Sequence, residues 1–475
     1  MMEKPRPTLE EIFHPRGVAV VGVSQSRGWA NTVVQSLIKA KFPAIYPVNP
    51  KYSEILGLRC YAGIRDIPGV VDHVIVSIPA AGVLSLLDDC AAKGVRSVHF
   101  FTSGFSESGY AERAELEKTM LDKARAGGFR IIGPNSVGLF VPASRLVNKL
   151  STPLEPGHVA FISQSGGYVE DIHLSAAPRG LRFSKVVSYG NALDVNESEL
   201  LEYLATDPDT EIIASYIEGV REGRRFVEAL RTAAARKPVV ICKGGTTEAG
   251  TRTTYGHTAS LTSSMVVFDA LCRQMRAIRV DSVDELIDVL VAFSFVSPLP
   301  RGKGVAVVGA GGGVSVMAAD EMEKEGFHLP RFSSETQAEL GQFLAFAGGI
   351  LSNPVDAETI GTPPAIASTM RVLSRLPEID LLVYHLGFHP LSQWGQRRFS
   401  AADFLKPAVD TFQDVRQKTG KPVLLVLRPA LDMEGLPEFL TAQEAFVNAG
   451  LPVFYSFRQA GRAIARLQAR QQWQH

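Results

Sequence analysis

Short apolar segments rich in β-branched residues alternate along the chain with longer segments whose apolar residues recur at helical spacing. The first apolar segments are GVAVVGV (17–23), AIYPV (44–48), HVIVSI (73–78), SVHFFTS (97–103) and FRIIG (129–133). Helical stretches such as NTVVQSLIKA and AGVLSLLDDCAAKG lie between them, and the second of these ends at Gly94, a helix-stopping residue. Strands that alternate with helices predict parallel sheets covered by helices, and therefore an α/β protein.

This pattern starts again twice. A second round begins at HVAFISQSG (158–166) and continues through FSKVVSYG, TEIIASYIEG and PVVICKGG, and a third opens with VAVVGAGGG (305–313). Between them, the Pro- and Gly-rich segment VSPLPRGKG (296–304) is the best linker candidate. For 475 residues, at roughly 150 residues per domain, we expect three domains, at 1–148, 149–298 and 299–475.

Composition narrows the classes of partner and compartment. Lys+Arg and Asp+Glu both number 49, so the formal net charge is +0, and without a basic tract we expect no nucleic-acid partner. The four cysteines are far apart and form no CxxC, which indicates reduced, structural thiols. The N-terminus lacks the apolar core of a signal peptide, and no run approaches the length of a membrane span. We therefore expect a cytoplasmic protein without a membrane partner.

Each round opens on a strand that leads through a Gly- or Ser-rich turn into a helix: GVSQSRGW (22–29), SQSGGY (163–168) and GAGGGVS (309–315). The N–H groups at a helix start are unpaired and the helix dipole is positive there, so such turns bind phosphate or carboxylate. One such turn could equally serve close packing of strand and helix, but three at equivalent positions favour anion binding. The first turn does not fit NAD, because Ser24 replaces the second glycine of GxGxxG.

The motifs of the first round, GVSQSRGWANTVVQSL, YPVNPKY, SIPA, FTSGFSESG and GPNSVGLF, resemble the CoA-binding domain of the NDP-forming acyl-CoA synthetases, relatives of the succinyl-CoA synthetase alpha subunit. GHVAFISQSGG, SYIEGV and GHTAS are similar to that family's second domain with its phosphohistidine loop. VAVVGAGGGVSVMAAD and SNPVD are similar to its third unit. The resemblance covers nearly the whole chain in the order of the ADP-forming alpha subunit. It implies a Rossmann-like CoA-binding domain followed by two flavodoxin-like, doubly wound domains.

The same resemblance implies that acyl-CoA, phosphate and ADP are interconverted with a carboxylic acid, CoA and ATP through an acyl phosphate and a phosphohistidine. His257 would carry the phosphoryl group and Glu218 would orient it. A neutral imidazole is a nucleophile near pH 7, and the glycines between 244 and 256 predict a mobile loop with few packing contacts. Taken singly, these two residues could also be a surface-loop histidine without a role and a strand-end carboxylate facing water.

Binding residues are implied position by position. The phosphate-binding residues are Ser163, Ser165, Gly166 and Gly167, with Gly311, Gly312 and Gly313 supplying an opposing helix start. The residues near CoA are Gly22, Ser24, Lys51, Ser77, Pro79, Ser103, Gly104 and Asn135. Lys51 would suit an adenosine phosphate, although a solvated surface lysine is the simpler interpretation. The family often has cysteine where this chain has Ser136, and no metal site is expected.

A complete synthetase of this kind also needs an ATP-grasp module that binds ATP or ADP with Mg. No GxxxxGK[ST] motif occurs, so we expect a separate ATP-grasp beta subunit and a hetero-oligomer. Two other functions stay open: a CoA- or acyl-CoA-binding regulatory protein without turnover, and an acyltransferase, whose relatives carry a further domain. The acyl group, the choice between ADP and GDP, the oligomeric state and activity without the partner cannot be inferred from the sequence.

Overall fold

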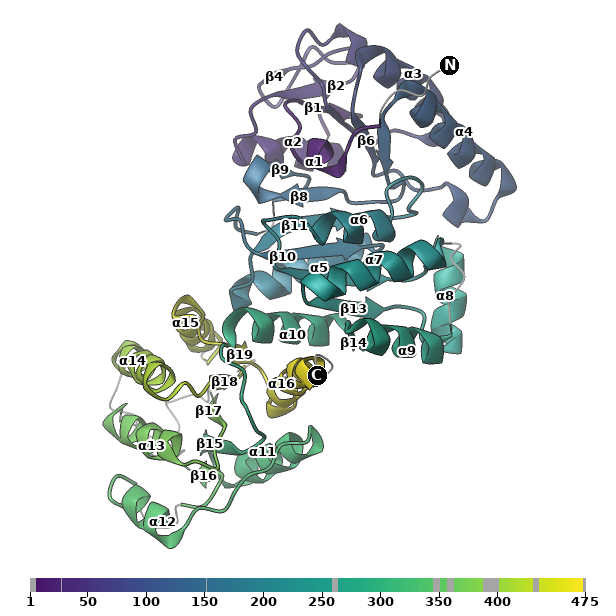
Figure 1. Ribbon diagram of the computed structural model, residues 1–475. Helices are drawn as coiled ribbons and strands as arrows, with labels where there is room; N and C mark the ends of the chain where they lie inside the picture. Colours follow the sequence, from purple (N-terminus) through teal and green to yellow (C-terminus); the bar gives the residue numbers. More distant parts are fainter. Residues whose placement is uncertain are drawn as a thin grey trace. The chain divides into compact units, whose positions relative to one another are not determined.

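The computed structural model describes residues 6–26, 28–150, 152–258, 264–344, 351–356, 363–387, 401–429 and 435–472 of the chain. The chain divides into two compact units. Unit 1 comprises residues 1–177 and 182–286, and unit 2 comprises residues 178–181 and 287–475. Both units contain parallel strands alternating with helices (Figure 1), as the sequence pattern predicts.

The first sheet of unit 1 has the strand order β2-β1-β5-β6-β7, with all neighbours parallel. Each of the five apolar segments predicted as strands contains one of them: β1 (Val18–Val21), β2 (Ile45–Val48), β5 (His73–Val76), β6 (Ser97–Phe100) and β7 (Arg130–Ile132). The helices around this sheet are α1 (Leu9–Phe13), α2 (Trp29–Lys39), α3 (Val83–Lys93) and α4 (Ala111–Gly127). Gly94 caps α3 in the left-handed region (φ 75°), where a glycine avoids the strain of a side chain.

The second sheet of unit 1 has the order β14-β13-β12-β10-β11-β8-β9. Its parallel strands are β10 (Val159–Ser163), β11 (Phe183–Ser188), β12 (Ile212–Ile217), β13 (Val239–Lys243) and β14 (Ile278–Val280). Two short strands, β8 (Leu139–Val141) and β9 (Leu146–Val147), extend its edge in antiparallel pairing. The accompanying helices are α5 (Gly166–Ala176), α6 (Glu197–Leu204), α7 (Gly223–Arg236), α8 (Glu248–Thr258), α9 (Met265–Met275) and the start of α10 (Val283–Phe295).

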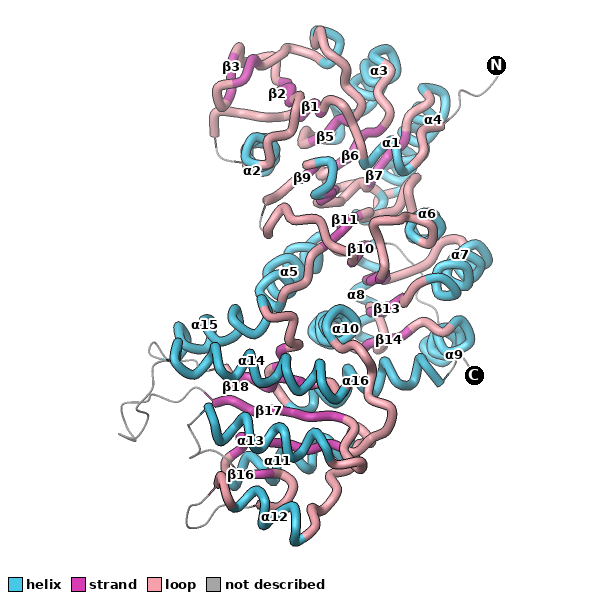
Figure 2. The backbone as a smooth tube through the Cα atoms, turned by 60° about the vertical axis from the view of Figure 1, so that its left-hand side comes forward, coloured by secondary structure: helices cyan, strands magenta, loops and turns pink. Residues whose placement is uncertain are grey.

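Unit 2 contains a parallel sheet of order β16-β15-β17-β18-β19. The strands are β15 (Val305–Ala310), β16 (Val355–Asp356), β17 (Leu381–Gly387), β18 (Val423–Arg428) and β19 (Val453–Phe454). Helices α12 (Ser334–Gly341), α13 (Pro363–Arg375), α14 (Ala401–Thr419) and α15 (Gly435–Asn448) pack in a row on one face. Helices α11 (Gly312–Lys324) and α16 (Phe457–Gln472) pair on the other (Figures 1 and 2).

A short hairpin and several single helical turns complete the described elements. The hairpin joins β3 (Glu54–Ile55) to β4 (Leu58–Arg59). The 3-10 turns are η1 (Ile64–Asp66), η2 (Ala80–Gly82), η3 (Ser106–Ser108), η4 (Pro142–Ser144) and η5 (Ala177–Arg179).

All three parallel sheets share one topology. Numbered in chain order within each sheet, the parallel strands run 2-1-3-4-5, the flavodoxin-like order. In such sheets the strand order reverses between the first and third strands, and ligands bind at the carboxyl ends of those two strands. This rule places candidate sites at β1/β5, β10/β12 and β15/β17.

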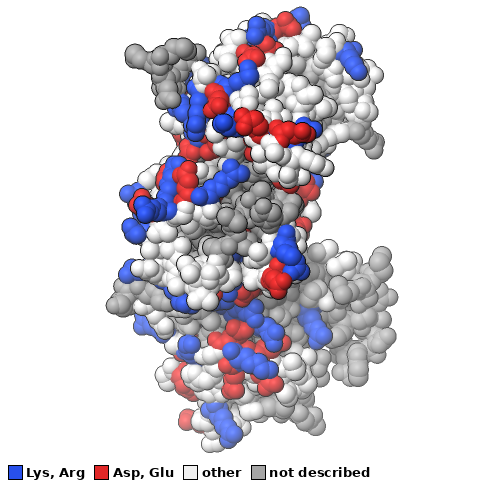
Figure 3. Space-filling view, turned by 90° about the vertical axis from the view of Figure 1, so that its right-hand side faces the viewer, with Lys and Arg blue, Asp and Glu red and all other residues white. Residues whose placement is uncertain are grey.

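The interior of both units is mainly apolar, and the surface carries charges of both signs. The central strands are buried along their length, as in parallel sheets covered on both faces, and all four cysteines are buried and unpaired. Basic and acidic side chains are interspersed over the face drawn in Figure 3. Among the residues that the structure describes, no helix is both long and apolar enough to cross a membrane.

Candidate functional site

A cavity of about 480 Å³ lies in unit 1 at the carboxyl ends of β5, β6 and β10. Residues predicted for two different purposes line it together. The predicted CoA contacts in its wall are Ser77, Pro79, Ser103 and Asn135, and the predicted phosphate contacts are Ser165, Gly166 and Gly167. The tertiary structure therefore joins strand ends of the first sheet to the glycine-rich turn of the second in one site.

Two further predicted CoA residues shape the end of β1 without lining this cavity. Gly22 has φ 94°, and a Cβ there would lie 2.2 Å from the Ser77 carbonyl oxygen, so only glycine allows the close approach of β1 to β5. The Ser24 N–H donates to Asn31 Oδ1 at 3.2 Å, which closes the turn before α2. These two residues thus have a demonstrated structural role.

The remaining two predicted CoA residues also lie outside the cavity wall. Lys51 is exposed, and its N–H donates to Asn49 Oδ1 at 2.9 Å. Gly104 has φ 93°, and its N–H donates to Glu107 Oε1. Since Glu107 also accepts from Asn191 Nδ2, this carboxylate folds the loop after β6 back onto the second sheet.

The turn after β10 is shaped by its own serines. The buried Ser163 hydroxyl donates to the Ser165 carbonyl at 2.7 Å and accepts from the Ser165 N–H at 3.1 Å. Ser165 then caps α5 by accepting from the Tyr168 N–H at 3.4 Å. The N–H groups of Gly166 and Gly167 occupy the first turn, where the helix offers no acceptor, and both residues line the cavity. This arrangement can bind an anion.

Glu218 follows β12 directly, at the point where the strand order of the second sheet reverses. The N–H groups of Glu218 and Gly219 donate to Gln164 Oε1 at 2.5 Å and 3.0 Å. The Glu218 side chain is buried, and the Tyr216 hydroxyl donates to its Oε1 at 3.4 Å. The predicted glutamate is therefore held next to the predicted phosphate turn.

Helix α8 occupies most of the segment for which the sequence predicts a loop. The Thr251 N–H donates to the Thr247 carbonyl as the helix begins, and Arg252 pairs with Glu248 one turn earlier at 2.7 Å. The backbone of His257 belongs to α8, whereas its side chain lies outside the described part of the structure. Helix α8 contacts η3, in the loop that follows Ser103 of the cavity wall.

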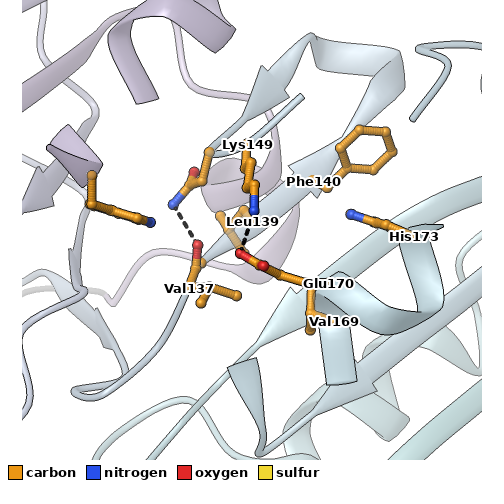
Figure 4. A pocket seen from close by; sticks show the side chains of 10 residues that line it. Val137, Leu139, Phe140, Lys149, Val169, Glu170 and His173 are labelled. Carbon is orange, nitrogen blue, oxygen red and sulfur yellow. Dashed lines mark hydrogen bonds and ion pairs between the residues drawn. The ribbon is translucent and has the colours of Figure 1, made fainter. Parts of the chain in front are cut away.

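A second, much smaller cavity of about 20 Å³ lies beside the first and shares Val137 with it (Figure 4). Lys149 and Glu170 form an ion pair of 2.7 Å in its lining, and His173 lies in its wall on α5. Burial lowers the pKa of His173 to about 4, so this ring is neutral at pH 7. The volume suits about one water molecule, which makes this cavity a packing feature of the domain.

The three predicted glycines of unit 2 border a separate cavity of about 590 Å³ within that unit. Gly311 is the N-cap of α11, and Gly312 and Gly313 form its first turn. His385 near the end of β17 and the exposed Arg428 at the end of β18 lie in the same wall. A helix start beside a guanidinium group is again suited to an anion.

Sequence reasoning missed three polar residues that organise the site in unit 1: Gln164, Tyr216 and Lys243. Gln164 stands inside the SQSGG motif, so its position was a signal that went unused. Tyr216 and Lys243 lie within strand patterns, where nothing in the sequence marks them as polar contacts of Glu218. The structure reveals them because neighbouring parallel strands end at the same edge of the sheet.

Comparison with known families defines the class of protein first. Residues 16–142 match the model of a CoA binding domain, and residues 156–293 match that of a succinyl-CoA ligase like flavodoxin domain. A CoA-binding domain followed by a ligase-type flavodoxin-like domain is thus the class that fold and site define.

Comparison with individual proteins identifies the family. The alpha subunit of ADP-forming acetate–CoA ligase II of Pyrococcus furiosus is 35% identical over 376 residues, which cover 79% of this chain and 81% of the relative. ADP-forming acetate–CoA ligase II of Archaeoglobus fulgidus is 33% identical over 472 residues, 97% of this chain and 67% of the relative. Acetyl-coenzyme A synthetase 1 of Candidatus Korarchaeum cryptofilum, solved in complex with phosphate and ADP, has a TM-score of 0.80 and 28% identity, covering 98% of this chain and 97% of that one. The chain belongs to the ADP-forming acetate–CoA ligase family, as its motifs predict.

Proposed function

We propose that this chain is the alpha subunit of an ADP-forming acyl-CoA synthetase, which interconverts acyl-CoA, phosphate and ADP with a carboxylic acid, CoA and ATP. The observation that carries the proposal is the shared cavity of unit 1, where the start of α5 meets strand ends of the CoA-binding sheet. The names of the relatives support the same reaction, and the solved neighbour is a complex with phosphate and ADP.

In the first step, phosphate is held by the N–H groups of Gly166 and Gly167 and attacks the thioester carbonyl carbon. A C–O bond to phosphate forms, the C–S bond breaks, and CoA leaves as a thiolate that takes up a proton. The N–H groups and the dipole of α5 counter the negative charge on phosphate. The products are an acyl phosphate and free CoA.

In the second step, His257 attacks the phosphorus atom of the acyl phosphate. An N–P bond forms, the P–O bond to the acyl group breaks, and the carboxylate leaves. Glu218 accepts a hydrogen bond from the other ring nitrogen of His257, which selects the nucleophilic tautomer and stabilises the imidazolium of the phosphorylated state. The phosphoryl group then passes to ADP.

The partners and compartment follow from the same reaction. ADP, with Mg, is bound by an ATP-grasp beta subunit, so the working enzyme is a cytoplasmic hetero-oligomer. The name of the Pyrococcus furiosus relative, a subunit alpha, supports a partner subunit. We retain Gly22, Ser24 and Lys51 as contacts near the nucleotide portion of CoA, and Gly104 as a CoA contact that follows a strand end. We also retain domain boundaries after residues 148 and 298.

Phosphohistidine formation tests this function. The chain is incubated with an acyl-CoA and ³²P-labelled phosphate, and acid-labile label on the protein is measured over time. We expect labelling in the wild type and none in His257→Asn, while His14→Asn, which changes an exposed histidine of α1's C-cap, labels normally. Stoichiometric CoA binding without label under any acyl donor would favour the regulatory alternative. Label that survives in His257→Asn would refute the assigned carrier.

A further inference from the structure

Lys243 is a buried cation whose position the proposed reaction does not yet explain. It ends β13, is only 3% exposed, and its Nζ donates to the carbonyl oxygens of Glu218 at 2.6 Å and of Gly244 at 2.5 Å. Burial lowers the pKa of its ammonium group. Burying an ammonium group is unfavourable unless hydrogen bonds compensate for its lost hydration, so a buried lysine that only joined two strand ends would lower stability.

The two carbonyls that Lys243 joins belong to the two segments that the reaction must bring together. Glu218 is the residue that orients the histidine, and Gly244 begins the segment that leads into α8 and His257. One ammonium group therefore fixes the end of β12 and the start of the carrier segment relative to each other.

Gln164 makes the corresponding link on the other side of Glu218. Its Oε1 accepts the N–H groups of Glu218 and Gly219, while its own N–H donates to the Tyr216 carbonyl at 3.2 Å. Gln164 is 5% exposed and also lines the cavity beside Ser165. It thus ties the phosphate turn directly to the strand end that carries the glutamate.

Gly244 leaves the space that the Tyr216 and Glu218 side chains occupy. A Cβ at this position would lie 2.4 Å from the Tyr216 hydroxyl oxygen and 3.4 Å from Glu218 Cγ. Only a residue without a side chain allows the Tyr216 hydroxyl to reach the Glu218 carboxylate while Lys243 grips the neighbouring carbonyl.

We propose that Lys243 and Gln164 are positioning residues for phosphoryl transfer, which hold Glu218 and the start of the carrier segment in register with the phosphate turn. This inference rests on the proposed function. It extends that function, because it makes the rate of phosphoryl transfer depend on two buried residues that need not touch the substrate. A shift of about 1 Å in a catalytic group lowers a rate up to about a hundredfold.

The chain offers a matched control in Lys237, just before β13. Its Nζ also donates to two backbone carbonyls, those of Leu204 at 2.6 Å and Asp207 at 2.5 Å, and its pKa is likewise lowered mainly by burial. Lys237, however, lies at the amino end of the strand, at the edge of the sheet opposite to Glu218. The two lysines form the same kind of bridge at sites with and without the proposed chemistry.

The experiment compares Lys243→Met with Lys237→Met in the phosphohistidine assay, together with CoA affinity and melting temperature. We expect Lys243→Met to slow labelling of His257 by about tenfold to a hundredfold at unchanged CoA affinity. Lys237→Met should lower the melting temperature and leave the labelling rate unchanged. Gln164→Met, which removes a neutral acceptor, should slow labelling in the same way and serves if Lys243→Met does not fold.

The outcomes separate this inference from the proposed function. If the wild type is not labelled, the proposed function fails and the positioning role falls with it. If the wild type is labelled and Lys243→Met and Gln164→Met label as fast as Lys237→Met, the positioning role alone is overturned. A labelling rate in Lys243→Met that falls only in proportion to the folded fraction would assign Lys243 to stability and also overturn it.

Discussion

The glycine-rich turns after β10 and β15 have the same place in their sheets but differ in the side chains that hold them. Both follow the first strand of a 2-1-3-4-5 sheet and open a helix whose first N–H groups border a cavity. The β10 turn is held by hydrogen bonds of the Ser163 and Gln164 side chains, and its helix is capped by the Ser165 side chain. The β15 turn ends in the N-cap Gly311, which has no side chain to offer.

This difference shows which part of an anion site the fold supplies and which part side chains must add. A strand, a turn and a helix start are enough to bind an anion, and both turns have them. In the reaction that we propose, the contacts of Gln164 and Lys243 with Glu218 hold this carboxylate and the carrier segment next to the β10 turn. The β10 turn is therefore the better candidate for the place where covalent chemistry occurs.

The largest effect should come from removing the Glu218 carboxylate, which is held next to the β10 turn. Glu218→Gln keeps the shape of the side chain but cannot stabilise an imidazolium ion. We expect the phosphohistidine rate to fall by up to about 10⁴-fold, by analogy with the loss of the carboxylate from a catalytic triad. Rapid quench-flow labelling measures the rate. A change of less than about threefold would show that Glu218 does not act on the phosphorylated histidine.

A matched pair of alanine substitutions compares the two turns directly. A Cβ on Gly166 would lie 2.7 Å from Val137 Cγ1, whereas a Cβ on Gly313 would meet nothing within 4 Å. Gly166→Ala should displace Val137 or the start of α5 and slow turnover by up to about a hundredfold. Gly313→Ala should be neutral or stabilise α11 by about 0.5–1 kcal/mol. Equal losses of turnover in both variants would show that packing does not distinguish the turns.

Acid should affect unit 1 through the histidines behind its cavity. His99 Nε2 donates to the Ser136 carbonyl at 2.8 Å, and burial lowers the pKa of His99 to about 4. Below pH 6.5 the unfolded chain gains a proton that folded His99 does not, so the unfolding free energy falls as the pH drops from 6.5 towards 4. For one histidine the loss is about 2 kcal/mol at pH 5.

Urea denaturation at pH 7 and pH 5 measures this loss, and limited proteolysis near the midpoint identifies the unit that opens. His73, whose pKa burial lowers to about 3, should add to the effect in unit 1. Identical midpoints at the two pH values would contradict a neutral, buried His99.

The smallest effect should come from removing the Tyr216 hydroxyl group, which donates a hydrogen bond to Glu218. Tyr216→Phe removes a long hydrogen bond of 3.4 Å to Oε1 but keeps the ring, which packs 4.4 Å from that of Tyr168. A lost hydrogen bond of this kind is worth about 1 kcal/mol, so the phosphohistidine rate should fall by about fivefold. An unchanged rate would show that Tyr216 does not help to position Glu218, and would leave the roles of Gln164 and Lys243 unaffected.

Much of the fold and part of the site could be predicted from particular residues. The apolar runs that became β1, β10 and β15 are recognisable because parallel strands are buried on both faces. That Ser165 lines one cavity with Ser77 and Asn135 was not predicted, because the phosphate turn and the CoA residues belong to different sheets and only the tertiary structure brings them together. The helix over Glu248–Thr258 was missed because its glycines and threonines are typical of a loop, while Glu248 and Arg252 pair only once the turn has formed.

By itself, the sequence determined the α/β class, the three glycine-rich turns and the family, because these depend on local periodicity and on motifs within short segments. Tertiary structure alone decided that Gln164, Glu218 and Lys243 would come together. Gln164 and Glu218 directly follow β10 and β12, Lys243 ends β13, and the three are up to 79 residues apart in the chain. The physical reason is that strand order is set by how helices pack on a sheet. Only that order brings the polar ends of distant strands to one edge.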